Sequence, residues 1–137
     1  FDKEPNIALV SFSNFGSSKG KVPQKMQNAY KLAKLRYPDL HIEGEMQANV
    51  ALNAKLMKEN YPFSSLNETG ANTLIFPDLA SGNASYKVLQ ELGQVEAIGP
   101  VLLGMKKPVH ILQMGSSVRE IINMVAIAVV EAQQVQK

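Results

Sequence analysis

The stretch Asn6-Ile-Ala-Leu-Val-Ser-Phe-Ser13 carries the main expectation about the fold. Its apolar residues fall on both faces of an extended chain, because neighbouring side chains of a strand point to opposite sides. A strand that is apolar on both faces is typical of a parallel sheet with helices covering each side. We therefore predict a buried strand over residues 6–13, in a sheet that is covered on both faces.

The segments downstream alternate between strands and helices. A Ser/Gly-rich turn over residues 14–20 leads into a predicted helix with Pro23 at its first position and Pro38 at its end. The periodicity predicts further strands over residues 41–47, 72–77 and 108–113, further helices over 48–57, 82–92 and 117–133, and a loop over 60–71. Residues 98–104 could form a short strand or an ordered loop. This alternation predicts a three-layer α/β fold, with a mainly parallel sheet and helices on both faces.

Composition excludes several classes of function. The chain has 137 residues, a net charge of +2 with both signs scattered, and no cysteine. It therefore lacks a basic face for nucleic acid, and it can form no disulfide, zinc thiolate or cysteine nucleophile. No apolar run reaches the ~18 residues of a membrane span, and no secretion signal opens the chain, so we expect a soluble, cytoplasmic protein. Because Phe1 is not an initiator methionine, we expect a piece of a longer protein or a chain trimmed of a tag.

The turn after the first strand is a candidate ligand loop. In open α/β sheets, ligands bind outside the carboxyl ends of the strands. Ser11, Ser13 and Ser17 bring hydroxyl groups to this position, and Gly16 lets the backbone approach closely, which suits a phosphate group. The turn matches neither of the two common glycine-rich phosphate-binding motifs. On the local sequence alone, a loop used only for its turn chemistry is therefore the favoured alternative.

A second candidate loop follows the strand predicted over residues 72–77. Asp78, Gly82 and Asn83 lie there, at the carboxyl end of the strand, where a ligand is expected. Helix capping by Ser81 or Asn83 explains the same spacing. Both interpretations can hold together.

Other polar residues give weaker signals. Glu43 and Glu45 share one face of a predicted strand and could form an acid/base pair or bind a hard metal ion. A solvated strand edge or a structural ion pair is the favoured interpretation. His41 and His110 have no second ligand at metal spacing, so no metal site is predicted.

The stretch LQMGSSVREIINM, residues 112–124, predicts a capped helix. Ser117 and Glu120 have the spacing of a capping box, and the free N–H groups of a first helical turn can hold an anion. The residues that lead into this turn are Gln113, Met114 and Gly115, which include no nucleophile, acid, base or cation. The helix that follows is apolar on more than one face. We expect it to be deeply buried or, if its neighbours are missing, to leave part of its apolar surface exposed or seek a partner chain.

Four segments resemble successive motifs of the phosphate acetyltransferase family, in the same order and over nearly the whole chain. They are IALVSFSNFGS, EGEMQANVALN, NTLIFPDLASGNASYKVLQELG and EAIGPVLLGMKKPVHILQMGSSVREIINMVAIAVVEAQ. The motif LIFPDL followed by GN and YK, with the later GP-x-L-x-G and KPV, is specific. KPVHILQ and INMVAIAVVEAQ most resemble the version of this domain that is fused to the C-terminus of bacterial NADP-dependent malic enzymes.

The resemblance implies a fold and a role. The fold is the isocitrate/isopropylmalate dehydrogenase-like fold of phosphotransacetylases, present in part, with residues 1–99 in the second α/β subdomain and residues 105–137 completing the first. The role is regulation and oligomerisation, with acetyl-CoA or a related metabolite as ligand and a homo-oligomer as the assembly. The resemblance implies no cofactor in this piece, and NADP with Mg²⁺ or Mn²⁺ in the malic-enzyme domain of the parent.

The resemblance also implies that the catalytic residues are missing. Members that transfer acetyl groups have Ser-Arg-Gly before the capped helix and an acidic residue in its first turn. The matching positions here are Gln113, Met114, Gly115 and Glu120. A thioether supplies neither the fixed charge nor the two-pronged hydrogen bonding of a guanidinium. The remaining candidates for ligand contact are Ser11, Ser13, Gly16, Ser17, Asp78, Gly82, Asn83, Lys107 and Gly115.

Two other functions stay open at this point. One is an active phosphate acetyltransferase, which moves acetyl between CoA and phosphate. The other is an assembly module that binds no ligand.

Overall fold

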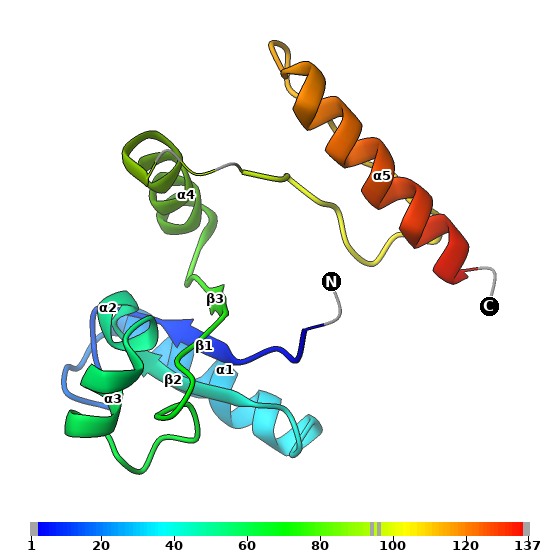
Figure 1. The fold of residues 1–137 in the computed structure, drawn as a ribbon. Helices are drawn as coiled ribbons and strands as arrows, with labels where there is room; N and C mark the ends of the chain where they lie inside the picture. Colours follow the sequence, from blue (N-terminus) through cyan, green and yellow to red (C-terminus); the bar gives the residue numbers. More distant parts are fainter. Residues whose placement is uncertain (1–2, 94, 96, 136–137) are drawn as a thin grey trace. The chain divides into compact units, whose positions relative to one another are not determined.

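The computed structural model describes residues 3–93, 95 and 97–135 (Figure 1). The chain divides into two compact units, Phe1–Lys87 and Val88–Lys137, and each is described here by itself. The elements in chain order are β1 (Ile7–Val10), α1 (Lys21–Arg36), β2 (Ile42–Met46), α2 (Ala48–Ala51), α3 (Ala54–Asn60), β3 (Thr73–Ile75), α4 (Leu79–Gly93) and α5 (Val118–Val135).

The three strands of the first unit form one parallel sheet in the order β2-β1-β3. Ile7 of β1 lies opposite Ile42 of β2 on one side and Thr73 of β3 on the other. All three carboxyl ends therefore lie at the same edge of the sheet. The parallel sheet predicted from the sequence is confirmed, with strands shorter than predicted.

Alternate residues of β1 pack into separate cores on the two faces of the sheet. Ala8 belongs to the core formed with α2, α3 and the loop after them; its buried members are Ala8, Met46, Val50, Ala51, Met57 and Leu66. Leu9 packs with Met26 of α1 and with Ile42 on the opposite face. Helices thus cover both faces, and the mixed α/β architecture predicted for the chain is confirmed.

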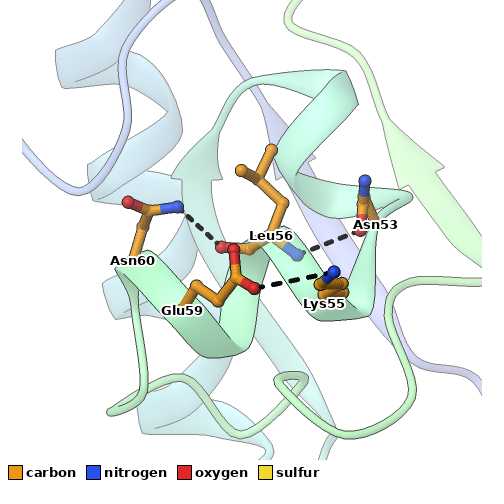
Figure 2. A network of polar contacts seen from close by, with 5 residues as sticks. All are labelled: Asn53, Lys55, Leu56, Glu59 and Asn60. Atoms are coloured by element: carbon orange, nitrogen blue, oxygen red, sulfur yellow. Dashed lines mark hydrogen bonds and ion pairs between the residues drawn. The ribbon is translucent and has the colours of Figure 1, made fainter.

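The helix predicted over residues 48–57 is in fact two helices. Asn53 interrupts it, because its side-chain oxygen accepts the Leu56 N–H at 3.0 Å and caps α3 (Figure 2). Asn60 donates to the Leu56 carbonyl at 3.0 Å at the other end of the helix. Lys55 and Glu59 are 4.0 Å apart on its exposed face, a separation at which an ion pair adds little stability.

Two predicted helix starts were wrong. α1 begins at Lys21, so Pro23 is its third residue and not its first. Proline is tolerated there because the first N–H groups of a helix have no partner within the helix. α4 begins at Leu79 and not at residue 82. Its cap is Asp78, which accepts the Ser81 N–H at 2.8 Å, so neither Ser81 nor Asn83 is the capping residue.

The second unit contains α5 and an extended segment before it. The strand predicted over residues 108–113 is wrong, since this segment has no pairing strand among the residues that the structure describes. Residues 98–104 form no strand either, which leaves the loop alternative. An apolar, extended segment becomes a strand only when a neighbour takes up its backbone hydrogen bonds.

Of the two alternatives predicted for α5, the structure matches partial exposure of its apolar surface and not deep burial. Met124 is buried, but Ile121, Ile122 and Val125 are 40%, 61% and 57% exposed. The helix therefore presents an apolar surface without a covering partner within the described part of the unit. None of the described helices combines the length and the apolar character that crossing a membrane requires.

Candidate functional site

Polar residues collect at the carboxyl edge of the sheet in the first unit. The Ser/Gly loop, residues 11–20, follows β1, Gln47 follows β2, and Asp78 stands just beyond β3. Gln47 ties two of these segments together, because its N–H donates to Asn14 Oδ1 at 2.7 Å and its side chain donates to the Phe12 carbonyl at 2.9 Å. The parallel topology thus brings the two predicted ligand loops to one edge.

Most serines of the loop use their hydroxyl groups within the loop itself. Ser13, which is fully buried, accepts the Ser18 N–H at 3.0 Å and lies 3.3 Å from the Ser17 hydroxyl. Ser17 in turn accepts the Asn14 N–H at 2.9 Å, and Ser11 accepts the Ser13 N–H at a long 3.4 Å. These contacts match the turn-chemistry alternative. Ser11, Ser13 and Ser17 as ligand contacts stay a prediction.

Two successive loop residues have backbone conformations in the left-handed region. Phe15 has φ 48° and Gly16 has φ 88°. The Phe15 ring packs against Tyr61 and Phe63, with ring centroids 5.0 Å away in each case. Left-handed backbone at a non-glycine residue is strained, so the surrounding contacts must hold it.

Glu45 supplies two of those contacts. Its carbonyl accepts the Phe15 N–H at 2.7 Å, and its Oε1 accepts the Gly16 N–H at 2.9 Å. Its side chain is 1% exposed. Burial raises the pKa of the Glu45 carboxyl, but hydrogen bonding from Ser13 and Gly16 lowers it more, so the pKa lies below its ordinary value. Glu45 is therefore a charged, buried anchor of the loop.

The two neighbouring glutamates do not form the acid/base or metal pair considered from the sequence. Glu43 accepts hydrogen bonds from Ser65, at 2.9 Å from its hydroxyl and 3.3 Å from its N–H. Glu45 faces the Ser/Gly loop instead. Their hydrogen-bond partners are neutral groups, so the structural ion pair, one of the two favoured interpretations, was wrong. β2 lies at the edge of the described sheet, as the strand-edge interpretation expects for Glu43. Among the described residues, no cluster of His, Cys, Asp and Glu could hold a metal ion.

Asp78 is positioned by the start of α4. It accepts the Ser81 N–H, and the Gly82 N–H donates to its carbonyl at 3.2 Å. Hydrogen bonds from Ser81, with a smaller contribution from the charge of Lys25, lower the pKa of the Asp78 carboxyl. Asn83 is exposed on the first turns of the same helix.

Lys25 is a cation at this edge that sequence reasoning missed. Its ammonium group donates to the Pro77 carbonyl, directly before Asp78. The available signal was its place in the second turn of the helix that follows the Ser/Gly loop, since the start of that helix faces the same edge.

The helix start predicted to hold an anion, residues 113–120, lies in the second unit and is called the α5 cradle below. Glu120 N–H donates to Ser117 Oγ at 3.2 Å, and Ser117 N–H donates to Glu120 Oε2 at 2.6 Å, which confirms the capping box. Gly115 has φ 94°, and the Met114 side chain is fully exposed. The capped start of α5 is thus present, and the residue 114 side chain before it carries no charge.

Lys107 lies elsewhere in the second unit. It lines a pocket of about 220 Å³ beside the last turns of α5; the other lining residues are Leu102, Gly104, Met105, Pro108, Glu131 and Gln134. Glu131 also binds His110, at 2.9 Å between carboxylate and ring nitrogen. This contact ties the extended segment to the helix.

Comparison with known proteins identifies related sequences. The family described as "Phosphate acetyl/butaryl transferase" matches residues 1–129. The chain is 42% identical over 131 residues to a phosphate acetyltransferase of Clostridium acetobutylicum, a match that covers 96% of this chain and 39% of that protein. It is 46% identical over 134 residues to an NADP-dependent malic enzyme of Haemophilus influenzae, covering 98% of this chain and 18% of that enzyme.

Solved structures show the same relationship. A phosphotransacetylase from Staphylococcus aureus, named EutD, matches with a TM-score of 0.83 at 35% identity, over 96% of this chain and 40% of the other. A phosphotransacetylase from Streptococcus pyogenes matches with a TM-score of 0.78 at 37% identity. The chain therefore spans about two fifths of these transferases.

Proposed function

Because the chain belongs to the phosphate acetyl/butaryl transferase family, we propose that it is the regulatory and assembly piece of an NADP-dependent malic enzyme. The parent oxidatively decarboxylates malate to pyruvate and CO₂ in the cytoplasm. Its malic-enzyme domain uses NADP and Mg²⁺ or Mn²⁺. The piece described here contributes no acetyl-transfer chemistry.

The observation that carries this proposal is that the residues before the capped start of α5, Gln113 and Met114, carry no charge. Gln113 and Met114 stand at the positions where the resemblance implies a reacting serine and a phosphate-binding arginine, and both are exposed. Removing one preorganised charge partner from an acyl-transfer site costs roughly 10²–10³ in rate. Here the hydroxyl is missing as well, whereas Gly115 and the capping box retain the backbone geometry.

The ligand of this piece is acetyl-CoA or a related metabolite. In the first unit, we assign its contacts to the carboxyl edge of the sheet, at the Ser/Gly loop and the start of α4. In the second unit, taken by itself, Lys107 and Gly115 are the candidate ligand contacts. The position of these loops supports the assignment, since open α/β sheets bind ligands outside the carboxyl ends of their strands.

The second unit completes another part of the fold. Residues 105–137 add the extended segment and α5 to a first subdomain supplied by the rest of the parent, and residues 1–99 form the second subdomain. The unpaired extended segment before α5 and the exposed Ile122 and Val125 support this division. The parent assembles as a homo-oligomer through this region.

Binding of acetyl-CoA to the purified parent tests the proposal. Calorimetry should show saturable binding, and malate oxidation should change when acetyl-CoA is added. Met114→Arg should strengthen binding by restoring a cation at the cradle. Leu103→Arg, which adds the same charge at another exposed site of the second unit, should not. Absence of binding and of any effect on malate oxidation would leave an assembly module without a ligand.

An active phosphate acetyltransferase is the second candidate. The 42% identity to the enzyme of Clostridium acetobutylicum favours it. An assay that follows acetyl transfer from acetyl phosphate to CoA separates the two candidates, as does the parent sequence. A parent of phosphotransacetylase length, without a nicotinamide-binding domain, supports this second function.

A further inference from the structure

Glu45 is an unusual residue of the first unit because it is both charged and buried. Its side chain is 1% exposed, and its Oε2 atom is buried without a hydrogen-bond partner among the described residues. Ionised groups are rarely buried, and an incompletely satisfied carboxylate costs stability. The remaining contacts of Glu45 include one that its charge strengthens.

Those remaining contacts hold one turn of the Ser/Gly loop. Phe15 and Gly16 donate their N–H groups to the carbonyl and to the side chain of Glu45. These are the two loop residues with left-handed backbone, at φ 48° and 88°. One residue of β2 thus stabilises the strained turn through two successive hydrogen bonds, one of them to a charge.

The register of the sheet places Glu45 for this contact. Leu9 pairs with Gly44 and Val10 pairs with Met46, so Glu45 is an extra residue between two paired positions. Gly44 permits β2 to lie close to Leu9 of β1, since a Cβ at residue 44 would lie 2.8 Å from the Leu9 carbonyl oxygen. An irregularity of this kind redirects a side chain that regular alternation would point elsewhere.

The turn that Glu45 holds belongs to the predicted ligand loop. Its conformation fixes where Gly16 and the Ser17 hydroxyl lie at the carboxyl edge of the sheet. Glu45 itself is covered by that loop and does not reach the surface.

We propose that Glu45 is a positioning residue, whose buried carboxylate holds the Ser/Gly loop in its ligand-binding conformation without touching the ligand. This inference rests on the proposed binding of acetyl-CoA at the loop. The effect of Glu45 on the conformation of the loop can be tested separately, without a ligand. Losing the charge at residue 45 leaves the fold intact and loosens residues 13–18.

Amide hydrogen exchange of the full-length protein tests the loop directly. Glu45→Gln keeps the shape of the side chain and removes its charge. Peptides covering residues 13–18 should exchange roughly tenfold faster or more, the factor expected when a hydrogen bond to a charged group is weakened. Peptides covering β1 should be unchanged. Glu43→Gln, two residues away on the same strand, is the matched control and should leave both regions at the wild-type rate.

The second measurement is acetyl-CoA affinity by calorimetry on the same variants. Glu45→Gln should weaken binding by roughly the same factor, and Glu43→Gln should not. Unchanged exchange in Glu45→Gln, or faster exchange of β1 and the loop alike, would overturn the positioning role. If the loop loosens but wild-type protein binds no acetyl-CoA, the proposed ligand is wrong and the role of Glu45 as the holder of the loop stands.

Discussion

Replacing Gly44 by alanine probes the close contact between β1 and β2. Gly44 has φ 141°, which an L side chain rarely adopts, and a Cβ there would lie 2.8 Å from both the Cβ and the carbonyl oxygen of Leu9. Backbone strain at such a position costs about 1–3 kcal/mol, and overpacking costs about 1–3 kcal/mol more. We therefore expect Gly44→Ala to lower the free energy of unfolding by about 2–6 kcal/mol.

That loss is large beside the total stability of a domain, about 5–15 kcal/mol. Chemical denaturation followed by far-ultraviolet circular dichroism measures it. Gly82→Ala is the matched control, since its Cβ would lie 3.5 Å from Phe76 Cβ, an ordinary contact, within α4. It should raise stability by up to about 1 kcal/mol, because alanine favours a helix over glycine. If the free energy of unfolding of Gly44→Ala lies within about 0.5 kcal/mol of the wild-type value, residue 44 is neither strained nor tightly packed against Leu9.

Two further predictions concern the first unit. The pKa of Glu45 is lowered below its ordinary value of 4.5, so its charge contributes stability above that value, and this contribution is lost as the pH falls through the lower, folded-state pKa. Acid unfolding of Glu45→Gln should therefore depend less steeply on pH below about 4.5 than that of wild type, and equal steepness would contradict the lowered pKa. Asn53→Ala removes the cap of α3 and should cost about 1 kcal/mol in chemical denaturation. Loss of stability no greater than that of Asn49→Ala, at an exposed position of α2, would show that the cap contributes nothing.

The fold could be predicted where local patterns and tertiary packing agree. The apolar run through β1 predicted a parallel sheet, and Ser117 with Glu120 predicted the start of a helix. The segment before α5 has a strand-like pattern but no neighbouring strand among the described residues, so its pattern alone could not decide its structure. The predicted start of α1 was displaced because Pro23 fits more than one position near a helix start, and that of α4 because Asp78 caps the helix instead of Ser81 or Asn83.

The candidate site was predictable in position but not in its chemistry. The rule that ligand loops follow strands located the Ser/Gly loop and Asp78 at one edge. The anchoring by Glu45 depends on an extra residue in the pairing of β1 with β2. This extra residue breaks the alternation of side chains between the two faces of a strand, from which Glu43 and Glu45 were predicted to share a face. Lys25 reaches Pro77 across more than fifty residues of chain, and no local spacing signals such a contact.

Acetyl transfer from acetyl phosphate to CoA, measured on the purified full-length protein, tests the central claim most directly. The account predicts no turnover above background for wild type, because Gln113 and Met114 offer neither a reacting hydroxyl nor a fixed positive charge. Turnover by wild-type protein at a rate that the double variant Gln113→Ser, Met114→Arg does not exceed would contradict it.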